Sequence, residues 1–550
     1  GGGGEAGEGG EAEPGAGAGR GAARRTEKRD FPAGSYIVRM DQPYSRIADA
    51  LFDYQYWSPN DPQSNPYDDT GWTFPEAFNV QAIRVMDTQV LEIPVEKIAG
   101  AVTAAGGVQR ATDGGAAATG TPAPVAAATA FAINHNADNA IFALRYRMPA
   151  ADIAVAEEPF ESGGMKFNRG SFILRNVSQA DLHRETTALG LKAFPLASAP
   201  TVKAHPARAA RVALMHTWTS TQTEGWWRIA LDNVGIPYEY ISTQEVARDA
   251  NLRAKYDVIL FAPGGGSSQS IINGMPMWRG PIPWKKSPDT PNIGTYAQTD
   301  DMRPGLGLQG LMNLQAFVKQ GGVYVGAVSS ATFALENGMT HGVSMNTPGT
   351  GSRVVGSLLR TQLVDDASPI VYGIQDRLAV YSDSGASFSV SATGGGGRGG
   401  GGGGAGRGGG AGPRATGRGL PDEVDSVQGR PALDPRFEAA PTPRVDAWAY
   451  ALPTDEQLRS PLNIIPPQYR PRVPLRFADQ NQLLVSGLLQ GGGDIAQRPV
   501  VVDVPMEQGH VVLFANNPLY RGSTVGSYAL VLNVIVNFDN LNAGRKNDIK

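Results

Sequence analysis

Apolar runs alternate with amphipathic stretches in a regular way after residue 210. The apolar runs predict buried strands at "RVALMH" (211–216), "PYEYIS" (237–242), "YDVILFA" (256–262) and "VYVGAVSS" (323–330). Between and after them, helical spacing predicts helices at "TEGWWRIALDNVG" (223–235), "TQEVARDANLRAK" (243–255), "GLQGLMNLQAFVKQGG" (307–322) and "ATFALENG" (331–338). Strands that are apolar throughout are typical of a parallel sheet covered on both faces. The pattern therefore predicts an α/β fold with a doubly wound, mostly parallel sheet.

The sequence before this region shows a less regular mixture of strands and helices. We expect a helix at "SRIADALFDYQYW" (45–57), a strand at "QAIRVMD" (81–87), a strand pair at "GGMKFNRGSFIL" (163–174) and a helix at "SQADLHRETTALG" (178–190). The stretch 129–149 is ambiguous between strand and helix. Ser178 followed by Asp181 marks the start of the last helix. These elements predict a smaller α+β region over about 30–204.

Three glycine-rich stretches interrupt the chain, which contains 70 glycines and 40 prolines. Residues 1–29 are expected to form a disordered linker, and about 100–127 and 392–420 flexible insertions. Beyond the last insertion, ordered sequence resumes at 481–489, 499–506 and 509–522 and ends in an apolar helix at 527–538, and we expect these segments to complete the α/β domain over about 205–545. The start "GGGGEAGEGG" has no Met, and we expect it to be the interior of a longer reading frame.

Charge and composition exclude several classes of function. The net charge is −4, and the Arg/Gly runs carry no interleaved aromatic residues, so we predict no nucleic-acid partner. No apolar run reaches the ~18 residues that a membrane span requires. The chain has no cysteine, which excludes disulfides, thiolate metal sites and a cysteine nucleophile.

Metal chemistry has little support in the sequence. None of the six histidines belongs to an H-x-x-E or H-E-x-x-H motif or to a close histidine pair. Asn and Asp side chains in "NHNADNA" (134–140) favour Asx turns over cation binding. We therefore predict no metal site and no cofactor in this chain.

A candidate nucleophile stands where the fourth strand enters a helix, at "GAVSSATFALENG" (326–338). A strand that ends in small-x-Ser-x-small has the form of a nucleophile elbow, with Ser329 as the exposed hydroxyl between Ala327 and Ala331. Activation would need a base, His341 or His216, and an orienting acid, Glu224 or Glu336. The alternative is a pair of serines that cap the helix.

A candidate binding crevice follows the third strand, at "PGGGSS" (263–268). The spacing matches neither a Walker A loop nor a dinucleotide fingerprint, so phosphate binding is not predicted. Glycines there permit a tight turn at the carboxyl end of the sheet, where α/β folds place their ligands. We expect Gly264, Gly265, Gly266 and Ser267 to line a crevice. Trp218 and Trp226 are candidate contacts for a peptide or a sugar, although helix packing would also explain Trp226.

Several segments, in order, resemble the C-terminal half of large bacterial zinc carboxypeptidase-like proteins. They are "FPAGSYIVRMDQPYSRIADALFD", "PYDDTGWTFPEAFNV", "WTSTQTEGWWRIALDNVGIPYEYI", "LQAFVKQGGVYVG" and "GHVVLFANNPLYRGSTVGSYALVLNVIVNF". In such proteins the zinc-binding metallopeptidase domain precedes this region. The resemblance implies a periplasmic or extracellular protein, with zinc held only in that preceding domain, which would also be a partner of this chain.

The region from residue 210 is also similar to class I glutamine amidotransferase-like domains, which share a flavodoxin-like arrangement. "YDVILFAPGGG" stands where that superfamily has a strand and glycine-rich turn, and "YVGAVSSA" where it has the elbow cysteine. Ser329 takes the cysteine's position, so the family's Cys-His-Glu triad is broken. The sequence thus predicts a non-catalytic accessory region that positions peptides or supports the peptidase. The alternatives are a serine hydrolase centred on Ser329 and a structural assembly module.

Overall fold

The structure is a computed structural model that describes residues 29–31, 34–58, 66, 68–100, 102, 106–109, 128–264, 266–349, 351–393 and 464–546. The chain divides into two units, residues 1–37 and 38–550, and every element named below belongs to the second. Residues 1–28, most of 100–127 and all of 394–463 lie outside the described residues, so the linker and insertion predictions there are not tested.

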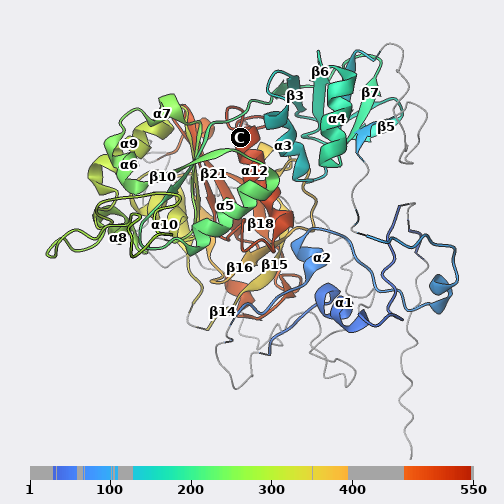
Figure 1. Cartoon of the computed structure of the whole chain (residues 1–550), viewed down its shortest axis with the longest axis horizontal. Coiled ribbons are helices and arrows are strands. Elements are labelled where there is room, and N and C mark those ends of the chain that lie inside the picture. Colours follow the sequence, from blue (N-terminus) through green and yellow to red (C-terminus); the bar gives the residue numbers. More distant parts are fainter. Residues whose placement is uncertain are drawn as a thin grey trace, which may run out of the picture. The chain divides into compact units, whose positions relative to one another are not determined.

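Among the described residues, ten strands form one large sheet whose first half is parallel (Figure 1). Its parallel strands, in spatial order, are β10 (Tyr238–Ser242), β9 (Val212–His216), β11 (Val258–Phe261), β12 (Val323–Ala327) and β22 (Gly509–Phe514). Every residue of the last four is buried. This matches the continuous apolar runs of the sequence, because each strand is covered on both faces.

The sheet continues in antiparallel pairing beyond β22. Its further strands are β21 (Pro499–Met506), β18 (Arg472–Phe477), β15 (Ser357–Leu363) and β16 (Ala379–Ser382), with β19 (Leu484–Ser486) also on β15. The predicted α/β fold class is confirmed. The parallel character is confined to the half that carries the candidate site.

Helices cover both faces of the parallel half. α5 (Gln222–Val234) and α12 (Tyr528–Val536) lie on one face, and α6 (Thr243–Arg248), α7 (Leu252–Lys255), α9 (Gly307–Lys319) and α10 (Ser329–Glu336) lie on the other (Figure 1). α5 ends at Gly235, whose φ of 84° places it in the left-handed region. The single helix predicted over 243–255 is two helices. The Asp249 carboxylate accepts the Asn251 N–H at 2.8 Å, a local bond that competes with helix continuation.

Six strands of the described residues form a second sheet in the order β1-β7-β2-β6-β3-β8. They are β1 (Gly107–Val108), β2 (Ala130–Ile133), β3 (Asp152–Ala156), β6 (Phe172–Arg175), β7 (Lys192–Leu196) and β8 (Ala204–Pro206), packed with α3 (Ala140–Arg147) and α4 (Gln179–Leu189). β1 lies within the stretch 100–127 that was predicted to be an insertion, and its residues Gly107 and Val108 pair with β7. The ambiguous stretch 129–149 contains a strand and then a helix, and Ser178 caps α4 as predicted.

Smaller elements complete the described chain. They are the hairpin of β4 (Phe160–Ser162) and β5 (Met165–Phe167), the pair β13 (Val343–Asn346) and β17 (Ser387–Val390), the pair β14 (Arg353–Val354) and β20 (Leu489–Gln490), α8 (Ser268–Asn273), and the 3-10 turns Pro369–Val371, Pro467–Tyr469, Gly492–Asp494 and Val525–Ser527. None of the helices in the described ranges is both long and apolar enough to cross a membrane.

The segment before residue 100 forms no strand of the second sheet. It contains α1 (Ser45–Phe52), α2 (Phe74–Ala77) and a 3-10 turn at Thr88–Leu91, and the strand predicted at 81–87 is absent. α2 instead attaches to the antiparallel half of the large sheet. Glu76 accepts two hydrogen bonds from Arg360 of β15, at 2.8 and 2.9 Å. The predicted region 30–204 therefore consists of a segment that packs on the large sheet and a separate sheet of its own.

Candidate functional site

The order of the parallel strands places a topological switch point at their carboxyl ends. The chain leaves β9 for β10 on one side and then crosses to β11 on the other. Loops that diverge in this way open a gap outside the sheet, which is where α/β folds bind ligands. The two loops at this switch point approach closely: a Cβ on Gly264 would lie 3.0 Å from the Ser220 hydroxyl. Glycine at 264 therefore allows the two loops to meet.

The turn between β12 and α10 has the geometry of a nucleophile elbow, with Val328 at its apex. Val328 has φ 50° and ψ −109°, and its N–H donates to the Phe514 carbonyl at 2.9 Å. A positive φ is a strained conformation for a β-branched residue. A Cβ on Gly326 would come within 2.8 Å of the Ser330 carbonyl oxygen, so the tight return of the helix requires glycine there. The apex thus lies one residue before the predicted Ser329, and it carries no reactive group.

The two serines after Val328 hold the elbow to the neighbouring glycine-rich turn. Ser329 Oγ accepts the Gly264 N–H at 2.8 Å and donates to the Gly264 carbonyl at 3.3 Å. Ser330 Oγ is fully buried, accepts the Ala327 N–H at 2.8 Å and donates to the Phe261 carbonyl at 2.5 Å. Neither hydroxyl caps α10, whose N-cap is Val328. The alternative of a capping serine pair is therefore corrected: these hydroxyls join β12 to β11.

The predicted bases are occupied by other partners. His341 Nε2 donates to the Tyr469 carbonyl at 2.6 Å, and His216 Nδ1 donates to the Thr217 carbonyl at 3.1 Å. Glu336 accepts a hydrogen bond from the Ser268 hydroxyl of α8. Within the described ranges, no hydrogen bond joins Ser329 to a histidine. Among the described residues, the hydrogen bonds of Ser329, His341 and His216 therefore form no Ser-His-acid relay at the elbow.

A buried aromatic and polar cluster lies at the carboxyl end of β9, against β10. The His216 ring stacks on Tyr240 with centroids 3.9 Å apart, and Trp218 meets His216 edge-on at 4.9 Å. Arg228 lies 4.7 Å over the Tyr240 ring. Burial lowers the pKa of His216 to about 4 and raises the pKa of Glu224 to about 7. His216 is therefore neutral at physiological pH, and Glu224 is near its midpoint.

Several buried polar atoms of this cluster have no hydrogen-bond partner in the described part of the chain. They are His216 Nε2, Thr217 Oγ1, Trp218 Nε1 and Glu224 Oε2. Because an unpaired buried polar group is costly, native structures rarely retain one without water or a ligand nearby. The cluster therefore groups four buried polar atoms whose hydrogen-bonding capacity water or a polar ligand would satisfy. Sequence reasoning found His216, Trp218 and Glu224 but missed Arg228 and Tyr240, which lie inside a helix and a strand without a motif.

The remaining predicted crevice residues divide into two groups. Gly264 and Gly266 belong to the turn, and Ser267 caps α8 by accepting the Ser270 N–H at 3.2 Å. Gly265 lies outside the described residues. The Trp226 ring meets Tyr520 edge-on at 4.8 Å, in the cluster that contains Leu358 and Tyr381 of the antiparallel half. This is the packing role that the sequence also allowed, and a contact of Trp226 with a ligand stays a prediction.

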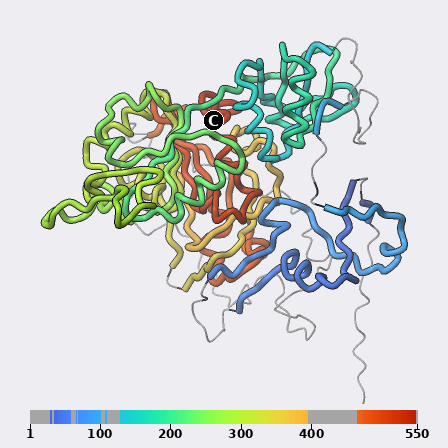
Figure 2. The backbone as a smooth tube through the Cα atoms, viewed as in Figure 1, coloured from blue at the N-terminus to red at the C-terminus, as the bar shows by residue number. Residues whose placement is uncertain are grey.

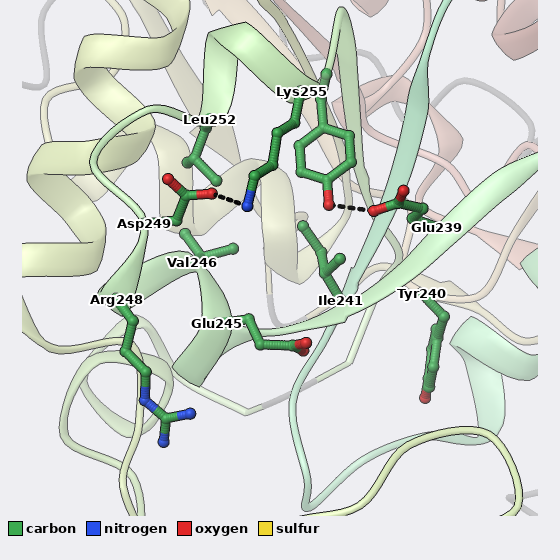
Figure 3. Close-up of a pocket in the computed structure, with 10 residues that line it drawn as sticks. Glu239, Tyr240, Ile241, Glu245, Val246, Arg248, Asp249, Leu252 and Lys255 are labelled. Carbon is green, nitrogen blue, oxygen red and sulfur yellow. Dashed lines mark hydrogen bonds and ion pairs between the residues drawn. The ribbon is translucent and has the colours of Figure 1, made fainter.

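A depression of about 620 Å³ lies beside β10, the edge strand of the sheet (Figure 3). Ile241, Val246 and Leu252 form its apolar floor, as Figure 3 shows. Its rim holds polar pairs, with Lys255 Nζ 2.7 Å from Asp249 and the Tyr256 hydroxyl bonded to Glu239. Tyr240 lines this depression and also stacks on His216, so the two features share one side chain.

The described residues contain no group of three or more histidine, cysteine, aspartate or glutamate side chains placed to hold a metal ion. The prediction that this chain binds no metal or cofactor stays untested.

No protein-family model and no curated protein matches the chain. Solved structures that resemble it include PurLQS from Thermotoga maritima, with 10% identity, a TM-score of 0.29 and coverage of 59% of this chain and 98% of that one. A putative GMP synthase protein from Thermoplasma acidophilum has 6% identity, a TM-score of 0.27 and coverage of 59% and 94%. A β-galactosidase from Bacillus circulans sp. alkalophilus has 11% identity, a TM-score of 0.25 and coverage of 60% and 31%. A glutamine amidotransferase from Thermotoga maritima is also among them, with 10% identity, a TM-score of 0.20 and coverage of 33% and 64%. At these TM-scores none of their activities is transferred to this chain.

Proposed function

We propose that the chain is a non-catalytic accessory region of a secreted zinc carboxypeptidase-like protein, and that its switch-point crevice binds peptide backbone. The proposal that the chain is non-catalytic rests on the position of Val328. The elbow holds this residue at the strained apex, and a valine side chain can neither attack a carbonyl nor be activated by a base. The zinc, the peptidase partner and the periplasmic or extracellular location belong to the proposal through the sequence resemblance alone.

The unpaired atoms of the crevice support a peptide ligand. Since Nδ1 of neutral His216 donates to the Thr217 carbonyl, its Nε2 is an acceptor, and it matches a peptide N–H. The Trp218 indole N–H and the Thr217 hydroxyl are donors without a partner among the described residues, and they match a peptide C=O. A backbone amide presents this combination of donor and acceptor, and it carries no charge to conflict with Arg228.

A calorimetric titration with capped tripeptides tests the binding. His216→Phe retains a ring on Tyr240 and removes the acceptor, so we expect affinity to fall about tenfold. His341→Phe is the matched control and should leave affinity unchanged. Equal affinity of His216→Phe and the parent chain contradicts the assignment.

The serine hydrolase centred on Ser329 remains the alternative, and an assay separates it. We expect the purified chain to hydrolyse neither peptides nor p-nitrophenyl esters. Hydrolysis that Ser329→Ala abolishes would replace the proposal by the hydrolase. The parentage has its own test, the reading frame upstream of Gly1: an H-x-x-E-bearing domain supports it, and a start codon with a signal peptide directly before Gly1 contradicts it. The structural assembly module would show neither binding nor hydrolysis.

A further inference from the structure

A long connection joins α8 to α9, and most of its apolar side chains are exposed. This arm, residues 274–304, projects away from the helices that flank it (Figures 1 and 2). It contains no helix and no strand longer than a single bridge. Its sequence from 275 to 288, "MPMWRGPIPWKKSP", combines two tryptophans, two methionines and an isoleucine with three cations and no acid.

The arm is held in place despite its lack of regular structure. Trp284 and Thr299 exchange both backbone hydrogen bonds, at 2.9 and 3.0 Å, and the Met275 N–H donates to the Arg303 carbonyl at 2.7 Å. Arg303 is 5% exposed, and its guanidinium donates to the Met277 and Arg279 carbonyls. These bonds join the end of the arm to its beginning. The backbone of residues 275–284 is therefore held to the returning part of the arm.

The stretch 277–284 of the arm exposes large apolar side chains to solvent. Trp278 is 74% exposed and Met277 57%, and Trp284 and Ile282 are 41% and 38% exposed. A group of exposed apolar side chains lowers the solubility of a protein, and it marks a surface that binds a membrane or another molecule. The Arg279 guanidinium lies 4.2 Å from the Trp278 ring, so a cation accompanies the most exposed aromatic group.

We propose that this arm docks the protein on an anionic phospholipid surface. Tryptophan prefers the boundary between headgroups and acyl chains, and methionine and isoleucine enter the acyl region beside it. Arg279, Lys285 and Lys286 lie in the same stretch, where they meet anionic headgroups. Lys285 also pairs with Asp300 at 2.6 Å, which leaves Arg279 and Lys286 as the cations that carry the charge preference.

Co-sedimentation of the full chain with vesicles tests the proposal. We expect binding to vesicles of phosphatidylcholine and phosphatidylglycerol in equimolar amounts, and much weaker binding to pure phosphatidylcholine. The double variant Trp278→Ala, Trp284→Ala should bind vesicles at least about tenfold more weakly, because it lacks the two large apolar side chains that would be buried at the membrane interface. Arg279→Glu with Lys286→Glu should remove the preference for phosphatidylglycerol and its sensitivity to salt.

Met86→Ala with Ile229→Ala is the matched control, since these residues are 72% and 50% exposed outside the arm. Its binding should equal that of the parent chain. All the altered side chains are on the surface, and circular dichroism confirms that each variant is folded. Absence of vesicle binding, or binding that the tryptophan changes leave intact, overturns the proposal. Binding to insoluble polysaccharide that depends on Trp278, without vesicle binding, replaces lipid by carbohydrate and also overturns it.

Discussion

The hydroxyl of Ser329 lies between the two backbone polar groups of Gly264, accepting from its N–H at 2.8 Å and donating toward its carbonyl at 3.3 Å. A hydroxyl used in this way is a link between the elbow and the glycine-rich turn. The apex beside it is Val328, so the geometry of a reactive turn persists around a side chain without chemistry. The contribution of the two elbow serines to the stability of the fold can therefore be measured by substituting each of them.

Ser329→Ala should cost about 1 kcal/mol of unfolding free energy, the usual contribution of one half-buried hydrogen-bonding hydroxyl. Ser330→Ala should cost more, roughly 2–3 kcal/mol, because it leaves the buried Ala327 N–H without its acceptor. Urea denaturation of the two variants measures the difference. The order of the two losses is the prediction, and the reverse order contradicts the structural role.

Replacement of Val328 separates backbone strain from side-chain contacts. Val328→Ala and Val328→Gly both remove the branched side chain, but only glycine adopts φ 50° without strain. We expect the glycine variant to be more stable than the alanine variant by about 1 kcal/mol. Thermal unfolding of both variants checks this, and equal stability would mean that the apex is not strained.

The buried Glu224 carboxyl makes stability fall as pH rises. Burial raises its pKa to about 7 from 4.5, so between these values the folded chain holds a proton that the unfolded chain has lost. The penalty is absent below about pH 4.5 and complete above about pH 7, and it amounts to about 3 kcal/mol. Glu224→Gln should therefore stabilise the protein at pH 8 and have little effect at pH 4.

Urea denaturation of the Glu224→Gln and parent chains at both pH values measures this difference. The comparison cancels the opposite effect of His216, whose buried ring resists protonation as pH falls. An advantage of the glutamine variant that is the same at both pH values contradicts the assignment.

The buried pair of Glu76 and Arg360 should fasten the segment around α2 to the large sheet. Glu76→Gln leaves the Arg360 guanidinium, 6% exposed, without its charged partner. We expect a loss of about 3–5 kcal/mol and faster proteolysis within residues 53–79. Glu76→Gln combined with Arg360→Met should recover much of the loss, and a double variant no more stable than the single one would contradict the pairing.

The sequence alone determined the parallel half of the fold and several helix ends. The apolar runs 211–216 and 256–262 predict buried strands, because a strand that is covered on both faces needs an apolar side chain at every position. This signal lies within the run itself. Gly235 and Ser178 mark helix boundaries for reasons that lie within a few residues of each. The glycine-rich turn directly after β11 was predicted from the same local signals.

The tertiary structure alone decided which residue occupies the apex of the elbow and what surrounds it. Serine, valine and alanine in "GAVSSA" are compatible with either register, and the choice comes from contacts with strands far away in the chain. Val328 is held at positive φ because its N–H pairs with Phe514 of β22 and Ser330 is fixed to Phe261 of β11. The same holds for β1 and for Trp226, whose places depend on pairing and packing across long sequence separations. Local pattern specifies elements, and only the non-local contacts among them place a side chain at the site.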